Sequence, residues 1–152
     1  QLGIQVLAVL QILPNIAFKY MLPQEAGGNQ NKRLKFLIIV IAAILTNCGI
    51  FLSPIIIPVL FTKYTNVVGV IQILSISLIP MSIIIAYQSK FLSIEKSNVI
   101  LISAGIYLAT QIILILILGK IYGVNGVAAA FVLATCAECA FYVFVNKFNR
   151  KF

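Results

Sequence analysis

The chain has 152 residues, of which 62% are hydrophobic and 9% charged; 11 Lys or Arg, 3 Asp or Glu and no His give a formal net charge of +8. Soluble domains are about half apolar and about a quarter charged, and a chain of this length cannot enclose so much apolar surface in a water-exposed globule. The composition therefore excludes most soluble enzymes and indicates a membrane protein, whose bases mark topology and not nucleic-acid binding.

Five apolar stretches follow one another along the chain, each close to the roughly 20 residues that a helix needs to cross the hydrocarbon core of a bilayer. Proline, glycine and polar residues separate the stretches. We therefore predict an all-α polytopic membrane helix bundle of five transmembrane helices, in which the first and third connections are long and the second and fourth short. The predicted spans are residues 2–22, 36–61, 67–87, 99–118 and 124–145.

Positively charged side chains are divided unequally between the two sides of this predicted bundle. Cytoplasmic loops of membrane proteins carry an excess of Lys and Arg. The excess here predicts a multi-pass protein of the cell membrane with Gln1 outside and the C-terminus in the cytoplasm. The bases on the predicted cytoplasmic side are Lys19, Lys32, Arg33, Lys35, Lys90, Lys96, Lys147, Arg150 and Lys151, and those on the opposite side are Lys63 and Lys120.

The predicted outer position of Gln1 raises a question about how it crosses the membrane. No Met, basic segment or cleavage site precedes the first apolar stretch at residue 2, so nothing in the sequence would deliver that end. We expect the chain to be the C-terminal portion of a longer transporter-like protein. A stand-alone protein with Gln1 produced by processing is the alternative.

Each predicted span carries its polar side chains on one face, because residues three, four or seven positions apart share a helix face. Small residues such as Ala42, Thr46, Gly49 and Ser53 are typical of packing seams between membrane helices. Bulkier polar side chains are a stronger indication of a cavity. The candidate cavity or substrate residues are Gln11, Asn15, Lys19, Gln72, Tyr107, Gln111, Glu138 and Tyr142.

Glu138 is the one acidic residue well inside a predicted span. An acidic side chain at that depth costs a few kcal/mol on insertion scales, and by default it faces a cavity, a charged partner or a proton path. Lys19 is the partner available within a span, although its long side chain can also reach the membrane surface. The alternative is a buried, protonated and hydrogen-bonded Glu138.

Prolines inside the spans predict bent helices, because each proline lacks a backbone donor. Pro14 and Pro80 lie near the middle of their spans, and Pro54 and Pro58 lie in the outer half of the second span. There Ser53 is placed to satisfy a carbonyl that loses its partner.

No catalytic group, metal site or cofactor site is predicted. Cys136 and Cys139 form a C-x-x-C pair, but they lie inside a predicted helix without a second cysteine pair. The glutamates Glu25, Glu95 and Glu138 are scattered and provide no paired carboxylates. We therefore expect a protein that is not an enzyme.

The order of several short stretches resembles a known family. The stretches are Leu60-Phe61-Thr62-Lys63-Tyr64, a span with Ile79-Pro80, the polar segment from Gln88 to Asn98, and Lys120-Ile121-Tyr122-Gly123-Val124-Asn125-Gly126 followed by an alanine-rich run. In this order and spacing they are similar to the C-terminal half of polysaccharide-export flippases, which belong to the multidrug, oligosaccharidyl-lipid and polysaccharide exporter superfamily. The resemblance covers nearly the whole chain.

The resemblance implies two six-helix lobes around a central cavity, with this chain supplying helices eight to twelve and the N-terminal lobe missing. It also implies a polyprenyl-diphosphate-linked oligosaccharide as the substrate, flipped to the outer leaflet for surface polysaccharide synthesis, and membrane lipids and the other lobe as partners. The local residues that best suit an anionic headgroup are Lys19 and the basic loop of Lys32, Arg33 and Lys35.

Two other functions stay open. An exporter of the same fold could expel cationic drugs, driven by a proton or sodium ion, with Glu138 as the coupling carboxylate. A membrane anchor or assembly subunit would transport nothing, and its polar residues would only hold the helices together.

Overall fold

The computed structural model describes residues 12, 15–16, 19–23, 32–60 and 68–149, and these residues form helices and tight turns without any strand. The predicted all-α class is thereby confirmed for this part of the chain. The longer helices are α2 (Lys32–Leu60), α3 (Val68–Ile76), α4 (Leu78–Ser93) and α5 (Ser97–Asn149).

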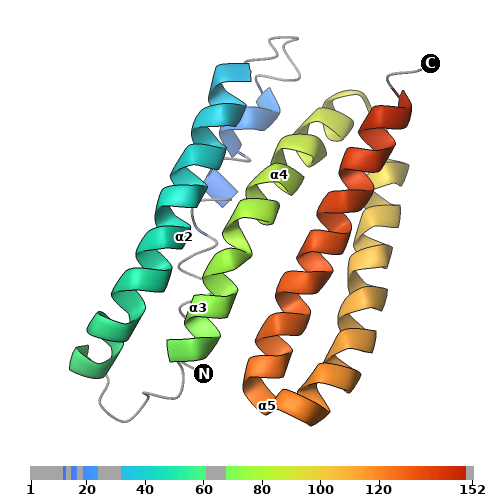
Figure 1. Ribbon diagram of the computed structural model, residues 1–152. Coiled ribbons are helices and arrows are strands. Elements are labelled where there is room, and N and C mark those ends of the chain that lie inside the picture. The colour runs from blue at the N-terminus through green and yellow to red at the C-terminus, as the bar shows by residue number, and fades with distance from the viewer. Residues whose placement is uncertain (1–11, 13–14, 17–18, 24–31, 61–67, 150–152) are drawn as a thin grey trace.

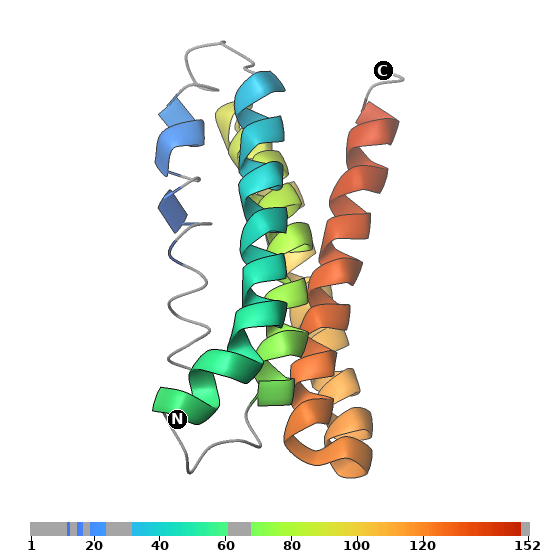
Figure 2. The ribbon, with the colours of Figure 1, turned by 60° about the vertical axis from the view of Figure 1, so that its left-hand side comes forward.

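Three segments of the described chain are long and apolar enough to cross a membrane, namely Lys35–Ile55, Val68–Ser93 and Ser97–Phe148. The third contains a chain reversal at Gly123, so α5 consists of a first limb (97–122) and a second limb (124–149) that run side by side in Figures 1 and 2. The predicted span 2–22 lies largely outside the described residues. A total of five spans therefore stays a prediction.

α2, the α3–α4 segment and the two limbs of α5 run alternately down and up the bundle (Figure 1). Both α3 and α4 contact α2 on one side and α5 on the other, so the α3–α4 segment is the centre of the bundle. The beginning of α2 and the ends of α4 and α5 lie at one end of the molecule, and the Gly123 turn lies at the opposite end. This arrangement brings the described bases of the predicted cytoplasmic side to one end, while their orientation across a membrane remains a prediction.

Proline explains the break between α3 and α4. Pro80 cannot donate a backbone hydrogen bond to the carbonyl of Ile76, and its ring crowds that carbonyl. The helix is interrupted at Ser77, whose hydroxyl donates to the Leu74 carbonyl at 2.6 Å. The helix is thus interrupted one turn before Pro80, where the sequence predicts a bend, whereas Pro14 lies outside the described residues.

A second proline frees a carbonyl inside α2. Pro54 has no N–H to offer the carbonyl of Ile50. That carbonyl instead accepts hydrogen bonds from Ser53 Oγ at 3.5 Å and from Gln72 Nε2 at 3.1 Å. Gln72 of α3 supplies the shorter bond, and Ser53, the residue predicted for this role, contacts the carbonyl at a distance longer than that of a good O–H···O bond. Figure 2 shows that α2 bends in its last turns.

The small-residue stripe of α2 is a packing seam, as predicted. Ala42 and Thr46 are buried, and Thr46 Oγ1 lies 2.8 Å from the Ala42 carbonyl and 3.1 Å from the Ser75 carbonyl. A Cβ added at Gly49 would collide with the Ser75 side chain. The absence of side-chain bulk on α2 therefore allows α3 to approach closely.

The predicted long connection over residues 88–98 is wrong. Helix α4 continues to Ser93, and a turn of Ile94, Glu95 and Lys96 leads directly into α5. The turn is a Schellman motif, in which Lys96 N donates to the Phe91 carbonyl at 2.9 Å and Glu95 N to the Leu92 carbonyl at 3.1 Å. Hydropathy falls after Tyr87, but the polar residues that follow still form helix.

The reversal in α5 depends on two glycines. Gly123 has φ 57° and ψ −132°, a conformation that is open essentially only to glycine. Gly126 packs so closely against the first limb that an added Cβ would overlap the Leu118 carbonyl. The predicted hairpin between the last two spans is confirmed, and its turn is tighter than the predicted residues 119–123.

We expect Gly126→Ala and Gly123→Ala to lower the free energy of unfolding, each by about 1–3 kcal/mol, because the first change creates a backbone collision and the second a strained backbone. Gly105→Ala is the control, since it lies in the middle of the first limb with open space around it, where alanine is the better helix former. Thermal unfolding of the purified protein in detergent measures the effect. Equal melting temperatures for all three variants would contradict this account of the hairpin.

Candidate functional site

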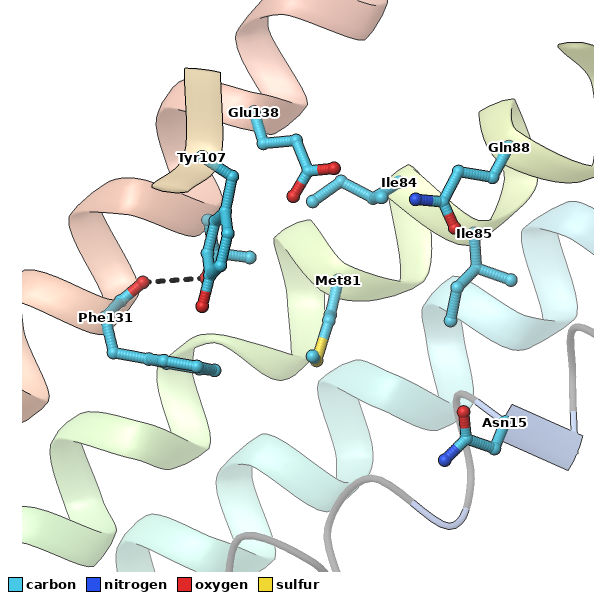
Figure 3. A pocket seen from close by; sticks show the side chains of 9 residues that line it. Asn15, Met81, Ile84, Ile85, Gln88, Tyr107, Phe131 and Glu138 are labelled. Carbon is cyan, nitrogen blue, oxygen red and sulfur yellow. Dashed lines mark hydrogen bonds between the residues drawn. The ribbon is translucent and has the colours of Figure 1, made fainter. Parts of the chain in front are cut away.

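A cavity of about 280 Å³ lies between α4, the two limbs of α5 and the N-terminal segment. Figure 3 shows Glu138 and Tyr107 on one side, Asn15 across from them, and Met81 between. The cavity combines amide, hydroxyl and carboxyl groups with apolar walls. Its lining residues are Asn15, Met81, Ile84, Ile85, Gln88, Tyr107, Phe131, Thr135 and Glu138.

Helical periodicity explains why these residues share one space. On α4 the four lining residues fall at intervals of three and four positions, from Met81 to Gln88. On the second limb of α5, Phe131, Thr135 and Glu138 follow the same spacing. Residues so spaced lie on one helix face, and the Gly123 reversal turns the faces of both limbs toward α4.

Glu138 is the buried acid of this site, with 9% of its surface exposed. Its Oε1 lies 3.4 Å from Ser103 Oγ on the first limb, longer than the roughly 2.5–3.0 Å of a good O–H···O bond. The Ser103 hydroxyl has nearer partners, the Ile100 carbonyl at 2.8 Å and the Tyr142 hydroxyl at 2.6 Å. Because serine carries a single hydroxyl proton, its bond to Glu138 is the weakest of the three.

Aromatic rings form a wall beside this polar cluster. The Tyr142 ring stacks on Tyr87 of α4 with centroids 6.3 Å apart and planes 4° apart, and Phe91 lies 5.9 Å away. Gln88 adds a side-chain hydrogen bond to the Tyr142 hydroxyl. The side chain of Tyr142, on the second limb, is fully buried. Stacking holds it against α4, and hydrogen bonding holds it against the first limb.

A second aromatic pair lies within the cavity itself. Tyr107 and Phe131 meet edge to face, with ring centroids 6.2 Å apart and planes at 89°, a favoured geometry for aromatic pairs. Thr135 Oγ1 donates to the Phe131 carbonyl at 2.7 Å, the bond drawn in Figure 3. The edge-to-face contact with Phe131 makes the ring of Tyr107 part of the wall.

Asn15, Tyr107 and Glu138 are the sequence candidates that the structure brings together in the cavity lining. Tyr142 adjoins them through Ser103. The Gln72 amide is used between α3 and α2, and the half-buried Gln111 does not line the cavity. These placements divide the candidates into one group at the cavity and others elsewhere on the bundle.

The basic candidates lie away from the cavity lining. Lys19 and Arg33 are exposed and Lys35 is half-buried. Arg33 borders an open apolar depression on α2 that it shares with Phe36, Leu37, Val40 and Ile41. Gln11 and the side chain of Lys32 lie outside the described residues.

Gln88 and Thr135 are the polar lining residues that the sequence candidates omit. Gln88 is omitted because it falls in the predicted third connection. The signal that could have found it is periodicity, since Gln88 follows Ile84 and Ile85 at intervals of four and three positions. Lys90 lies on the same helix and donates to Asn146 Oδ1 of the second limb at 2.6 Å. Extending the predicted third helix through these polar residues would have placed both Gln88 and Lys90 on that helix, where they make these contacts.

Within the described ranges, no group of three or more His, Cys, Asp or Glu residues could hold a metal ion. Cys48, Cys136 and Cys139 are not disulfide-bonded. No protein-family model, curated protein or solved structure matches the chain. The function therefore has to be inferred from the residues and their placement.

Tyr142→Phe is expected to lower the free energy of unfolding by about 1 kcal/mol, because it removes the hydroxyl that pairs with Ser103 and Gln88 in a buried cluster. Tyr122→Phe removes the same group from an exposed position on α5 and is expected to change little. Melting temperatures in detergent compare the two. An equal effect of both substitutions would show that the buried cluster adds nothing to the contribution of the Tyr142 hydroxyl to stability.

Proposed function

We propose that the chain forms part of the translocation path of a membrane transporter, and that this transporter flips lipid-linked oligosaccharide or polysaccharide repeat units for surface polysaccharide synthesis. The observation that carries the proposal is the polar cavity inside an apolar bundle. Ionisable and amide side chains inside membrane helices are rare, and they usually mark a substrate or ion pathway.

The outside of the bundle supports a membrane setting for this cavity. Large apolar side chains are exposed along α2 and both limbs of α5, including Ile55 at 67%, Leu101 at 77% and Val124 at 72%. A soluble protein seldom exposes such continuous apolar surface. Surrounding lipid would cover these side chains and leave the polar groups facing inward.

The chemistry of the lining suits a sugar. Asn15 and Gln88 supply amide donors and acceptors, Thr135 and Tyr107 supply hydroxyls, and Glu138 supplies a carboxyl group. Aromatic rings offer apolar surface against which the C–H face of a sugar ring packs. During flipping the lipid tail would stay in the bilayer beside the exposed apolar helices, while the sugar passes through the polar interior.

The described basic side chains suit the diphosphate group of such a substrate. Arg33 and Lys35 lie in the first turn of α2, and Lys90 and Lys96 lie in the last turn of α4 and in the turn that follows it, at the same end of the bundle. Lys and Arg bind phosphate oxygens by charge-assisted hydrogen bonds. A diphosphate would thus be met at the bundle end and the sugar within.

Export of a cationic drug is the second candidate function, and one observation favours it. The described lining of the cavity contains a carboxyl group and no Lys or Arg, which would suit a positively charged compound. A bundle that serves only as an anchor would have no use for this space.

Flipping is measured directly with the full-length protein in vesicles that contain a fluorescent polyprenyl-diphosphate oligosaccharide, by the fraction that becomes accessible to a quencher. We expect Gln88→Ala to slow flipping about five- to tenfold, the loss of one or two substrate hydrogen bonds. Gln111→Ala is the matched control, because it removes the same amide from a position outside the cavity lining, and it is expected to keep the wild-type rate.

Equal flipping rates in the two variants would show that the cavity has no role in transport. Vesicles that leave the lipid-linked sugar in place but expel a cationic dye would replace the flippase proposal with the drug exporter.

A further inference from the structure

We propose that the cavity selects sugars by charge, accepting a ring that carries hydroxyl or amino groups and rejecting a ring that carries a carboxylate, and that Glu138 sets this preference. The inference rests on the proposed function, because a sugar must first enter the cavity. It goes further in naming which sugars pass and which side chain decides.

The first observation is the unused bonding capacity of Glu138. A carboxylate accepts about four hydrogen bonds, yet among the described residues the hydrogen bond to this carboxyl group comes from Ser103 over 3.4 Å. The side chain is 9% exposed and lines the cavity. A buried polar group with poor partners is costly unless a ligand or water completes its bonds. Hydroxyl and ammonium groups of a sugar are donors that would do so.

The second observation is the distribution of charge around the cavity. Its other polar lining groups are the amides and hydroxyls of Asn15, Gln88, Tyr107 and Thr135, and none of the described lining residues is a base. Lys90 is also on α4, but its Nζ is bonded to Asn146, farther along the bundle than the lining residues of the second limb. A ligand carboxylate would therefore meet Glu138 without a compensating cation.

For the carboxylate form of Glu138, the sign of the resulting preference follows from electrostatics. Two carboxylates forced into one site of low polarity repel, and one of them can enter only by taking up a proton. An ammonium group meets the opposite situation, because a charge-assisted hydrogen bond to a carboxylate is stronger than a neutral one. A neutral hydroxyl lies between these cases. The expected order of binding is amino sugar, then neutral sugar, then uronic acid.

The size of the cavity limits how much of the substrate Glu138 can select. About 280 Å³ is just below the roughly 300–1,000 Å³ of pockets for drug-sized ligands. A space of this size holds one sugar ring and not a complete repeat unit. The selectivity therefore concerns the ring that sits against Tyr107 and Glu138.

The experiment compares three ligands that differ at few atoms: methyl glucoside, methyl glucosaminide and methyl glucuronide. Each is titrated calorimetrically into the full-length protein in detergent at neutral pH. We expect the glucuronide to bind at least tenfold more weakly than the glucoside, and the glucosaminide to bind at least as well as the glucoside. Glu138→Gln, nearly the same in shape, is expected to bring the three affinities within about threefold of one another.

Two further variants keep the result interpretable. Glu138→Asp retains the charge and is expected to retain the preference, and its melting temperature shows whether changes at this position preserve the fold. Glu95→Gln removes a carboxyl group from the exposed turn between α4 and α5, and it is expected to leave all three affinities unchanged.

Equal binding of glucoside and glucuronide to the wild-type protein, a preference that persists in Glu138→Gln, or no binding of any sugar would overturn the inference. Flipping of lipid-linked sugar by the same preparation is measured in a separate assay. Binding with the expected preference but without flipping would reject the proposed transport and leave the selectivity in place. Flipping without the preference would do the reverse.

Discussion

The structure depends above all on the need to satisfy polar groups inside an apolar bundle. In hydrocarbon no water is available to a free carbonyl or hydroxyl, so the helices themselves must supply the partners. The hydroxyls of Ser75 and Ser82 donate to carbonyls four residues earlier on their own helices. Gln72 and Ser53 together serve the Ile50 carbonyl that Pro54 leaves without a donor. The carbonyl that Pro54 leaves free in α2 is thereby served by specific side chains.

Glu138 is where this rule is least well obeyed. Among the described residues the hydrogen bond to its carboxyl group comes from Ser103, which is also engaged with Tyr142 and with a backbone carbonyl, and the cavity lies beside it. A bundle built only for stability would place an apolar residue or a better-bonded one at this position. The combination of a poorly bonded carboxyl group, several neutral polar groups and a space of sugar size is what gives the interior a functional interpretation.

The breaks in the helices determine which polar side chains face the cavity. The interruption at Ser77 separates α3, which packs against the α2 seam, from α4, which faces the cavity. The Gly123 reversal allows both limbs of α5 to face α4, so that Tyr107 from one limb and Glu138 from the other line a single space. Backbone geometry at a few residues thus determines which polar faces meet.

The sequence by itself determined the helical class, the apolar segments from residue 36 onward, the hairpin in α5, the role of Ser53 beside Pro54 and the unusual position of Glu138. These features depend on composition and on periodicity within one helix. The tertiary structure alone decided that Gln72 bonds to α2 while Asn15, Gln88 and Tyr107 share a cavity with Glu138. It also showed α4 continuing to Ser93, past the point where hydropathy falls. The physical reason is that a helix can be recognised from its own residues, whereas its rotation about its axis is set by packing against segments far away in the chain.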